Sequence, residues 1–154
     1  MKKYLFFLFI VGAIVSCTQD ESHGQSLTDS LLIQVANSPE YYQYELALNG
    51  IKPFIVAEFR DINMDSLQQK AVKYGLQMDE DCYVNDPTYL TDREERYLHL
   101  SCQVDRRITA LDEAFPALRK LPKEKFKEVR ELFLSDHPAF DVETNLIIDD
   151  LKKN

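Results

Sequence analysis

The segment from Thr91 to Phe115 constrains the fold of this chain more than any other. Thr91 and Glu94 have the spacing of a capping box, in which both side chains accept hydrogen bonds from backbone N–H groups at the start of a helix. Apolar side chains then recur every three or four residues, which is the period of one helix face. They are Tyr97, Leu100, Val104, Ile108, Leu111 and Phe115, and Pro116 follows. The pattern predicts a long amphipathic helix at the centre of a domain.

A second helix start is visible at Ser38-Pro39-Glu40. It combines a serine N-cap, a proline at the first helical position and an early acidic residue. The helix is predicted to run to about Leu48 and to end at Asn49-Gly50. Because Asn-Gly between apolar segments is also typical of a tight hairpin turn, an α+β fold with a hairpin around Asn49-Gly50 is the alternative. Pro53 favours the helix, since proline lacks the N–H group that a strand ladder needs.

The remaining segments predict shorter helices separated by short links and one loop. Leu121-Pro122 is expected to open a helix with its apolar residues facing inward, and Asp141 is expected to cap the last helix. Together the five to six short helices predict a compact all-α bundle. The predicted segments are helices at Leu27–Asn37, Pro53–Asp61 and Asp65–Tyr74 with Gly75 as C-cap, a loop over 77–90, inward residues Phe126, Val129, Leu132 and Phe133, and a last helix with Leu146, Ile147, Ile148 and Leu151.

Residues 1–16 have the three parts of a secretory signal peptide: a basic start, an apolar run from Tyr4 to Val15, and the small residue Ser16. The apolar run has about a dozen residues, whereas a membrane-spanning helix needs roughly 20. The tetrad Ile14-Val15-Ser16-Cys17 resembles the lipobox of bacterial lipoproteins, although Ile14 and Val15 are looser choices than that motif usually has. The resemblance covers only the start of the chain. An ordinary cleaved signal with an incidental cysteine is the alternative.

The lipobox resemblance implies cleavage before Cys17 and attachment of acyl chains such as palmitate to that cysteine. Several chains anchor a protein stably, because each buried methylene contributes roughly 0.8 kcal/mol. Residues 17–26 then form the lipidated cysteine and a polar, flexible tether, and residues 27–154 form a single domain. Thr18 in place of aspartate favours the outer membrane. Asp20-Glu21 resembles the export tails of some surface lipoproteins, so the periplasmic and surface faces both stay open.

The charge balance excludes some partners. The chain has a net charge of −8, and without Lys2 and Lys3 sixteen basic residues face 26 acidic ones. Nucleic-acid binding needs a basic footprint, which this chain lacks. The same balance argues against adhesion to anionic lipid headgroups by charge, so the acyl anchor has to hold the protein at the membrane.

Cys82 and Cys102 remain once Cys17 is assigned to the anchor. In an oxidising compartment such a pair predicts a disulfide. A loop of about 21 residues would contribute on the order of 3 kcal/mol to stability. The functional alternative is a reactive thiol, for which His99 is the one nearby activating group.

Few residues of the sequence suggest a catalytic or metal-binding site. Asp92, Glu95, His99 and Cys102 share roughly one face of a helix, so a metal site is conceivable, but a Glu95–His99 surface pair beside a disulfide is the preferred interpretation. No nucleophile elbow or phosphate-binding loop is present in the sequence. We therefore predict no catalytic residue, no metal ligand and no cofactor. The basic stretch from Arg119 to Arg130 predicts either a docking site for an acidic partner or the solvent-exposed face of a helix.

Tyr41, Tyr42 and Tyr44 are the candidate partner surface. Helical geometry spreads them over more than one face, so at least one is expected outside the core, where tyrosine suits interfaces. These features predict a membrane-anchored, non-catalytic accessory or binding subunit of a cell-envelope assembly with a protein partner. An envelope inhibitor or ligand-binding protein is the second hypothesis, and an enzyme of unrecognised type is the third.

Overall fold

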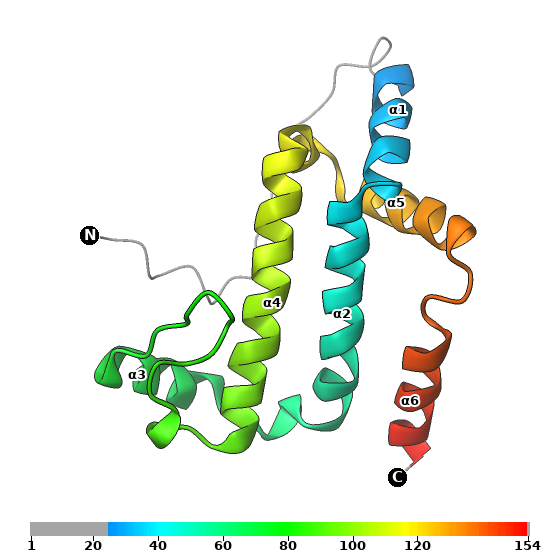
Figure 1. Cartoon of the computed structure of the whole chain (residues 1–154). Coiled ribbons are helices and arrows are strands. Elements are labelled where there is room, and N and C mark those ends of the chain that lie inside the picture. Colours follow the sequence, from blue (N-terminus) through cyan, green and yellow to red (C-terminus); the bar gives the residue numbers. More distant parts are fainter. Residues whose placement is uncertain (1–24, 154) are drawn as a thin grey trace.

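The computed structural model describes residues 25–153, which form a compact all-α fold, as predicted (Figure 1). The predicted signal peptide and Cys17 lie outside the described residues, and the first helix begins two residues inside the segment expected to be a tether. Within residues 25–153 the only β-type pairing is an isolated bridge between Met78 and Val84. The elements are α1 (Gln25–Ala36), α2 (Pro39–Ala57), η1 (Phe59–Asp61), α3 (Met64–Tyr74), η2 (Pro87–Tyr89), α4 (Asp92–Ala114), η3 (Pro116–Lys120), α5 (Lys123–Asp136) and α6 (Val142–Lys153).

Helices α2 and α4 form the central pair of the bundle, with α6 packed along α2 and α5 crossing α1 at one end (Figure 1). The predicted long helix is α4, and its capping box at Thr91 and Glu94 is formed by both reciprocal hydrogen bonds. No helix of residues 25–153 has both the length and the apolar content needed to cross a bilayer.

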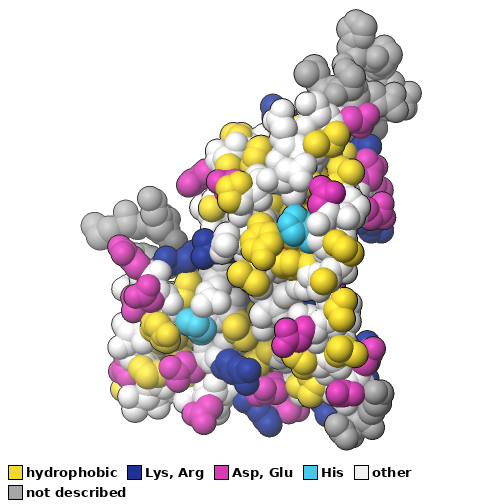
Figure 2. All heavy atoms as spheres, turned by 45° about the vertical axis from the view of Figure 1, so that its right-hand side comes forward, with side chains coloured by type: hydrophobic (Ala, Val, Ile, Leu, Met, Phe, Trp, Pro, Cys, Tyr) yellow, Lys and Arg dark blue, Asp and Glu magenta, His cyan; other side chains and the backbone are white. Residues whose placement is uncertain are grey.

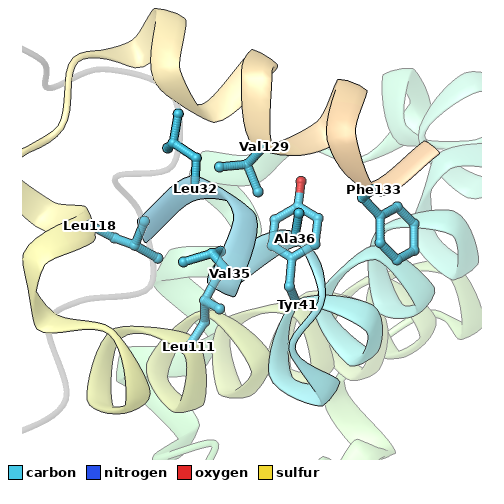
Figure 3. Close-up of a cluster of buried hydrophobic side chains, with 8 residues drawn as sticks. All are labelled: Leu32, Val35, Ala36, Tyr41, Leu111, Leu118, Val129 and Phe133. Atoms are coloured by element: carbon cyan, nitrogen blue, oxygen red, sulfur yellow. The ribbon is translucent and has the colours of Figure 1, made fainter. Parts of the chain in front are cut away.

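The larger hydrophobic core lies where α1 and α5 close over one end of α2 and α4 (Figure 3). Val35 and Val129 are fully buried there, and the Phe133 ring lies edge-on to the Tyr41 ring. A smaller core surrounds Phe54 at the other end of α2. The larger cluster comprises Leu32, Val35, Ala36, Tyr41, Leu111, Leu118, Val129 and Phe133.

The predicted end of α2 at Asn49-Gly50 is wrong, and so is the alternative hairpin. The helix continues to Ala57 with Pro53 inside it, so the separate helix expected at Pro53–Asp61 is the end of α2 followed by η1. The reason is tertiary: Ile51 and Phe54 are buried, and Phe54 packs with residues of α4. Burial of two large apolar side chains contributes roughly 1.5–3 kcal/mol each, which offsets the local cost of glycine and proline.

The inward positions of α5 are only partly as predicted. Val129 and Phe133 are buried, but Phe126 and Leu132 are 41% and 36% exposed. Val129 and Phe133 are four residues apart and lie on one narrow face, whereas Leu132 is rotated by about 100° from Phe133. Phe126 lies in the first turn and is not part of the core cluster.

Gly50 offers a direct test of the continuous α2 helix. It is exposed, and no atom lies within 4 Å of where a Cβ would be placed. Gly50→Ala should therefore raise the free energy of unfolding by about 0.5–1 kcal/mol, because alanine is the better helix former. Gly75→Ala is the matched control of opposite sign, since Gly75 ends α3 at φ 61° and alanine is strained there. Urea unfolding measures both, and a loss of stability in Gly50→Ala would contradict a helix at this position.

Candidate functional site

The loop after α3 is fixed to α4 by a cysteine pair. The sulfur atoms of Cys82 and Cys102 lie 2.14 Å apart, at disulfide distance, with their Cα atoms 5.7 Å apart. Both residues are buried. This geometry agrees with the predicted disulfide and leaves neither cysteine as a reactive thiol. Cys82 has φ 64°, in the left-handed region that non-glycine residues rarely adopt, so the loop is held in an unfavourable backbone conformation by its contacts.

Hydrogen bonds reinforce the same loop from inside and from α4. The Asp79 carboxylate accepts from the backbone N–H groups of Asp81 and Tyr83, at 2.9 and 2.8 Å. The Arg106 guanidinium donates to the carbonyl oxygens of Asp79 and Glu80. We refer to residues 79–83 as the clamped loop. Its position is fixed by the cysteine pair and by hydrogen bonds together, so it is a preformed feature of the surface.

His99 also belongs to this arrangement. Its Nδ1 atom lies 2.8 Å from the Cys82 carbonyl oxygen, which only accepts, so Nδ1 carries a proton. Its Nε2 atom lies 3.0 Å from the Gln103 side-chain nitrogen, which donates to it, and its ring stacks on Tyr83. Both ring nitrogens are thus engaged in hydrogen bonds, so the imidazole has a structural role. These contacts replace the expected Glu95–His99 surface pair, and no group of three metal-ligating side chains is placed for a metal ion anywhere in residues 25–153.

A groove of about 510 Å³ lies between α2, the clamped loop and α4. Leu46 of α2 is 49% exposed and supplies apolar surface, and the clamped loop contributes acidic side chains. Gly50 leaves its part of the wall without a side chain. The groove therefore offers apolar contact and charges of both signs at once, which suits a peptide or a small amphipathic ligand. It is lined by Gln43, Leu46, Ala47, Gly50, Glu80, Asp81, Cys82, Gln103, Arg106 and Arg107.

The three candidate tyrosines occupy different environments. Tyr41 is 2% exposed, so it belongs to the core, and its hydroxyl donates to the Glu45 carboxylate at 2.8 Å. Tyr44 is half-buried, and burial followed by the neighbouring Glu45 charge raises the pKa of both phenols. Tyr42 is 38% exposed and lies edge-on to the ring of Phe140. Of these three tyrosines, only Tyr42 is exposed.

Exposed apolar side chains are common on the side of the molecule where α6 lies. Figure 2 shows hydrophobic side chains across the middle of this face, between acidic and basic groups. On α6 itself, Leu146 is 62% exposed. The large apolar residues of α2 and α6 that are exposed are Tyr42, Leu46, Ile55, Val56, Val142, Leu146, Ile147 and Leu151.

A buried ionic network joins α2, α5 and the start of α6. Glu45 is 1% exposed, and its Oε2 atom lies 3.4 Å from Nε of Arg130. Arg130 also binds the Asp141 carboxylate, whose other oxygen lies 3.7 Å from Lys52. Burial raises the pKa of Asp141, but the nearby Asn49 amide and the charges of Lys52 and Arg130 outweigh it, so the pKa lies below its ordinary value. Two carboxylates face two cations, as expected of a structural network.

Sequence reasoning predicted the cysteine pair but missed Arg106 and the ionic network. Arg106 follows His99 and Cys102 by seven and four residues on the same helix, so its place on that face could have been read from the spacing. Glu45 and Arg130 are 85 residues apart and have no local signal.

Comparison of the chain with protein-family models, with curated proteins and with solved structures gave no match. No residue role is carried over from a relative. The groove and the clamped loop are therefore the features of the described residues that bear on function.

Proposed function

We propose that this protein is a lipid-anchored outer-membrane lipoprotein that acts as a non-catalytic accessory or binding subunit of a cell-envelope assembly. The anchor is supported by the signal pattern and by the resemblance of residues 14–17 to a lipobox. The first helix begins at Gln25, eight positions after Cys17. A folded domain would thus be tethered close to the bilayer, on either face of the outer membrane.

The observation that carries the binding role is the groove beside the clamped loop. Its walls come from two helices of the central pair and from a loop fixed by the cysteine pair and Arg106. Preformed surfaces bind with less ordering cost than mobile ones. Two groups nearby with the chemistry of catalytic residues, His99 and Cys102, are engaged in structural contacts. This arrangement supports recognition in preference to chemistry.

A second candidate function is ligand binding or inhibition by the same groove. Its volume of about 510 Å³ falls within the range of roughly 300–1,000 Å³ that is typical of small-molecule sites. A soluble one-to-one complex would favour this function over membership of a membrane assembly.

The experiment is a cross-linked pull-down of the acylated, full-length protein from its own membranes, with Cys17→Ser as the control. A stoichiometric membrane-protein partner that is lost in the control is the result expected for an anchored subunit. Recovery of a soluble protein in both samples would favour the second function. Absence of any partner in both samples would contradict the proposed assembly role.

Two matched substitutions on α2 test whether the groove binds the partner. Leu46 and Ile55 are 49% and 46% exposed, but they are nine residues apart, which places them on opposite sides of the helix. Leu46→Asp should reduce partner recovery about tenfold, because it places a charge on the apolar wall of the groove. Ile55→Asp should leave recovery unchanged. Equal recovery with both variants would show that the partner binds elsewhere.

A further inference from the structure

The segment from the end of η3 to the first turns of α5 carries a positively charged surface on an otherwise acidic protein. Residues 119–127 hold five basic side chains and one acidic side chain, Glu124. Two of the five are paired: Arg119 binds Asp112 at 2.8 Å and Lys125 binds Glu128 at 2.6 Å. The other three are exposed, and within residues 25–153 they form neither hydrogen bonds nor ion pairs. These are Lys120, Lys123 and Lys127.

An exposed aromatic ring lies among these cations. Phe126 is 41% exposed and is absent from the core clusters. Lys123 precedes Phe126 by three residues and Lys127 by four, so it neighbours both side chains on the helix surface. We call Lys120, Lys123, Phe126 and Lys127 the basic patch. A cationic helix face with an exposed apolar ring is typical of helices that lie on a membrane surface.

The basic patch lies close to the end of the domain that leads to Cys17. Asp29, in the first half of α1, lines a hollow together with Glu128 and Leu132 of α5. The two helices cross at this end of the molecule (Figure 1). Gln25, the first residue of α1, is one helical turn before Asp29. The start of α1 and the helix that carries Lys123 and Lys127 therefore lie at the same end of the domain.

We propose that the basic patch rests on an anionic bilayer, with the three lysines at the lipid headgroups and the Phe126 ring at the interface. This inference rests on the proposed anchor at Cys17. Eight residue steps from Cys17 to Gln25 reach at most roughly 28 Å, so the domain stays within range of the surface. The whole chain carries −8, so net charge does not hold it at an anionic surface and the acyl anchor has to do so. For the anchored domain, that surface favours the orientation that turns this patch inward and the acidic remainder outward.

The chain has no tryptophan, which makes a single reporter residue possible. Phe126→Trp is placed in the full-length acylated protein and reconstituted into vesicles that contain phosphatidylglycerol, with or without brominated acyl chains. Tyr83→Trp is the matched control, because Tyr83 is 57% exposed and lies in the clamped loop on the other side of α4. Tryptophan at 126 should be quenched by bromine about twofold or more, whereas tryptophan at 83 should not be quenched.

Removing the charges of the three lysines tests whether they hold the basic patch at the bilayer. Lys120→Gln, Lys123→Gln and Lys127→Gln combined should reduce quenching of the 126 reporter to the level of the 83 reporter. Lys73→Gln, Arg107→Gln and Lys152→Gln combined remove the same charge elsewhere and should leave the quenching unchanged. Equal quenching at 126 and 83, or quenching that persists in phosphatidylcholine vesicles, would overturn the inference. The mass of the N-terminal peptide shows whether Cys17 is acylated. An unacylated Cys17 would contradict the proposed anchor. An acylated protein whose reporter at position 126 is not quenched would contradict only the proposed orientation.

Discussion

Arg130→Met is expected to lower the free energy of unfolding by about 3 kcal/mol, because it leaves the buried Glu45 carboxylate without its cation. Glu45 is 1% exposed, and the Tyr41 hydroxyl would remain as its hydrogen-bond donor. Asp141 would also lose a partner but would keep Lys52 at 3.7 Å. Methionine preserves much of the arginine stem, so the loss reports mainly on charge. Since α5 and the start of α6 meet α2 through this network, their docking should weaken together.

Two further variants distinguish the effect of the unpaired buried charge on stability from the effect of losing any arginine side chain. Arg107→Met removes a cation that is exposed and has no partner within the described part of the chain, so it should change stability by less than about 0.5 kcal/mol. Glu45→Gln combined with Arg130→Met removes both charges and should recover a large part of the loss. Urea unfolding at neutral pH measures all three. A loss in Arg130→Met no larger than in Arg107→Met would rule out a stabilising role for the network.

The network also predicts a pH dependence with a definite sign. The pKa of Asp141 is lower in the folded protein than in the unfolded chain. Its contribution to stability is therefore complete above the unfolded pKa of about 3.9 and is lost as the pH falls through the folded pKa. Arg130→Met removes one cause of the lowered pKa. The wild type is expected to be more stable than Arg130→Met, and the share of this difference in free energy of unfolding that comes from Asp141 should diminish below about pH 4.

The sequence predicted those parts of the fold that depend on neighbouring residues. The caps at Ser38, Thr91 and Gly75 are formed as expected, because each depends on residues at most four or five positions apart. Prediction failed at Asn49-Gly50, where the local signal for a helix end is outweighed by burial of Ile51 and Phe54. That burial depends on α4, which follows tens of residues later, and no local pattern contains it.

The candidate site was predictable only in its covalent part. Cysteine count and compartment identified Cys82 and Cys102, but the groove needs α2, the clamped loop and α4 to meet. The same limit applies to the tyrosines: Tyr41 and Tyr42 are adjacent in sequence, yet one is in the core and the other is exposed. Helix rotation separates them by about 100°, and which of the two faces inward is set by the positions of α1 and α5.

Removal of the cysteine pair should have an effect of similar size but a different cause. Cys82→Ser with Cys102→Ser should lower the free energy of unfolding by about 3 kcal/mol, because the unfolded chain gains the freedom of a loop spanning 20 residues. Cys102→Ser with Cys82→Gly should lose about 1 kcal/mol less, since glycine adopts φ 64° without strain. Urea unfolding measures both variants, and reduced wild type is the reference for effects of the serine side chains.

The same variants test whether the clamped loop depends on the cysteine pair. Without the sulfur–sulfur bond, the loop keeps its hydrogen bonds to Arg106 and His99 but loses its covalent restraint. Hydrogen exchange should therefore increase at residues 79–83 while α2 and α4 stay protected. Partner recovery should then fall with the disulfide variants as it does with Leu46→Asp, because one wall of the groove has lost its fixed position. If exchange at the loop is unchanged and recovery is full, Arg106 and His99 suffice to form the site and the cysteine pair serves stability alone.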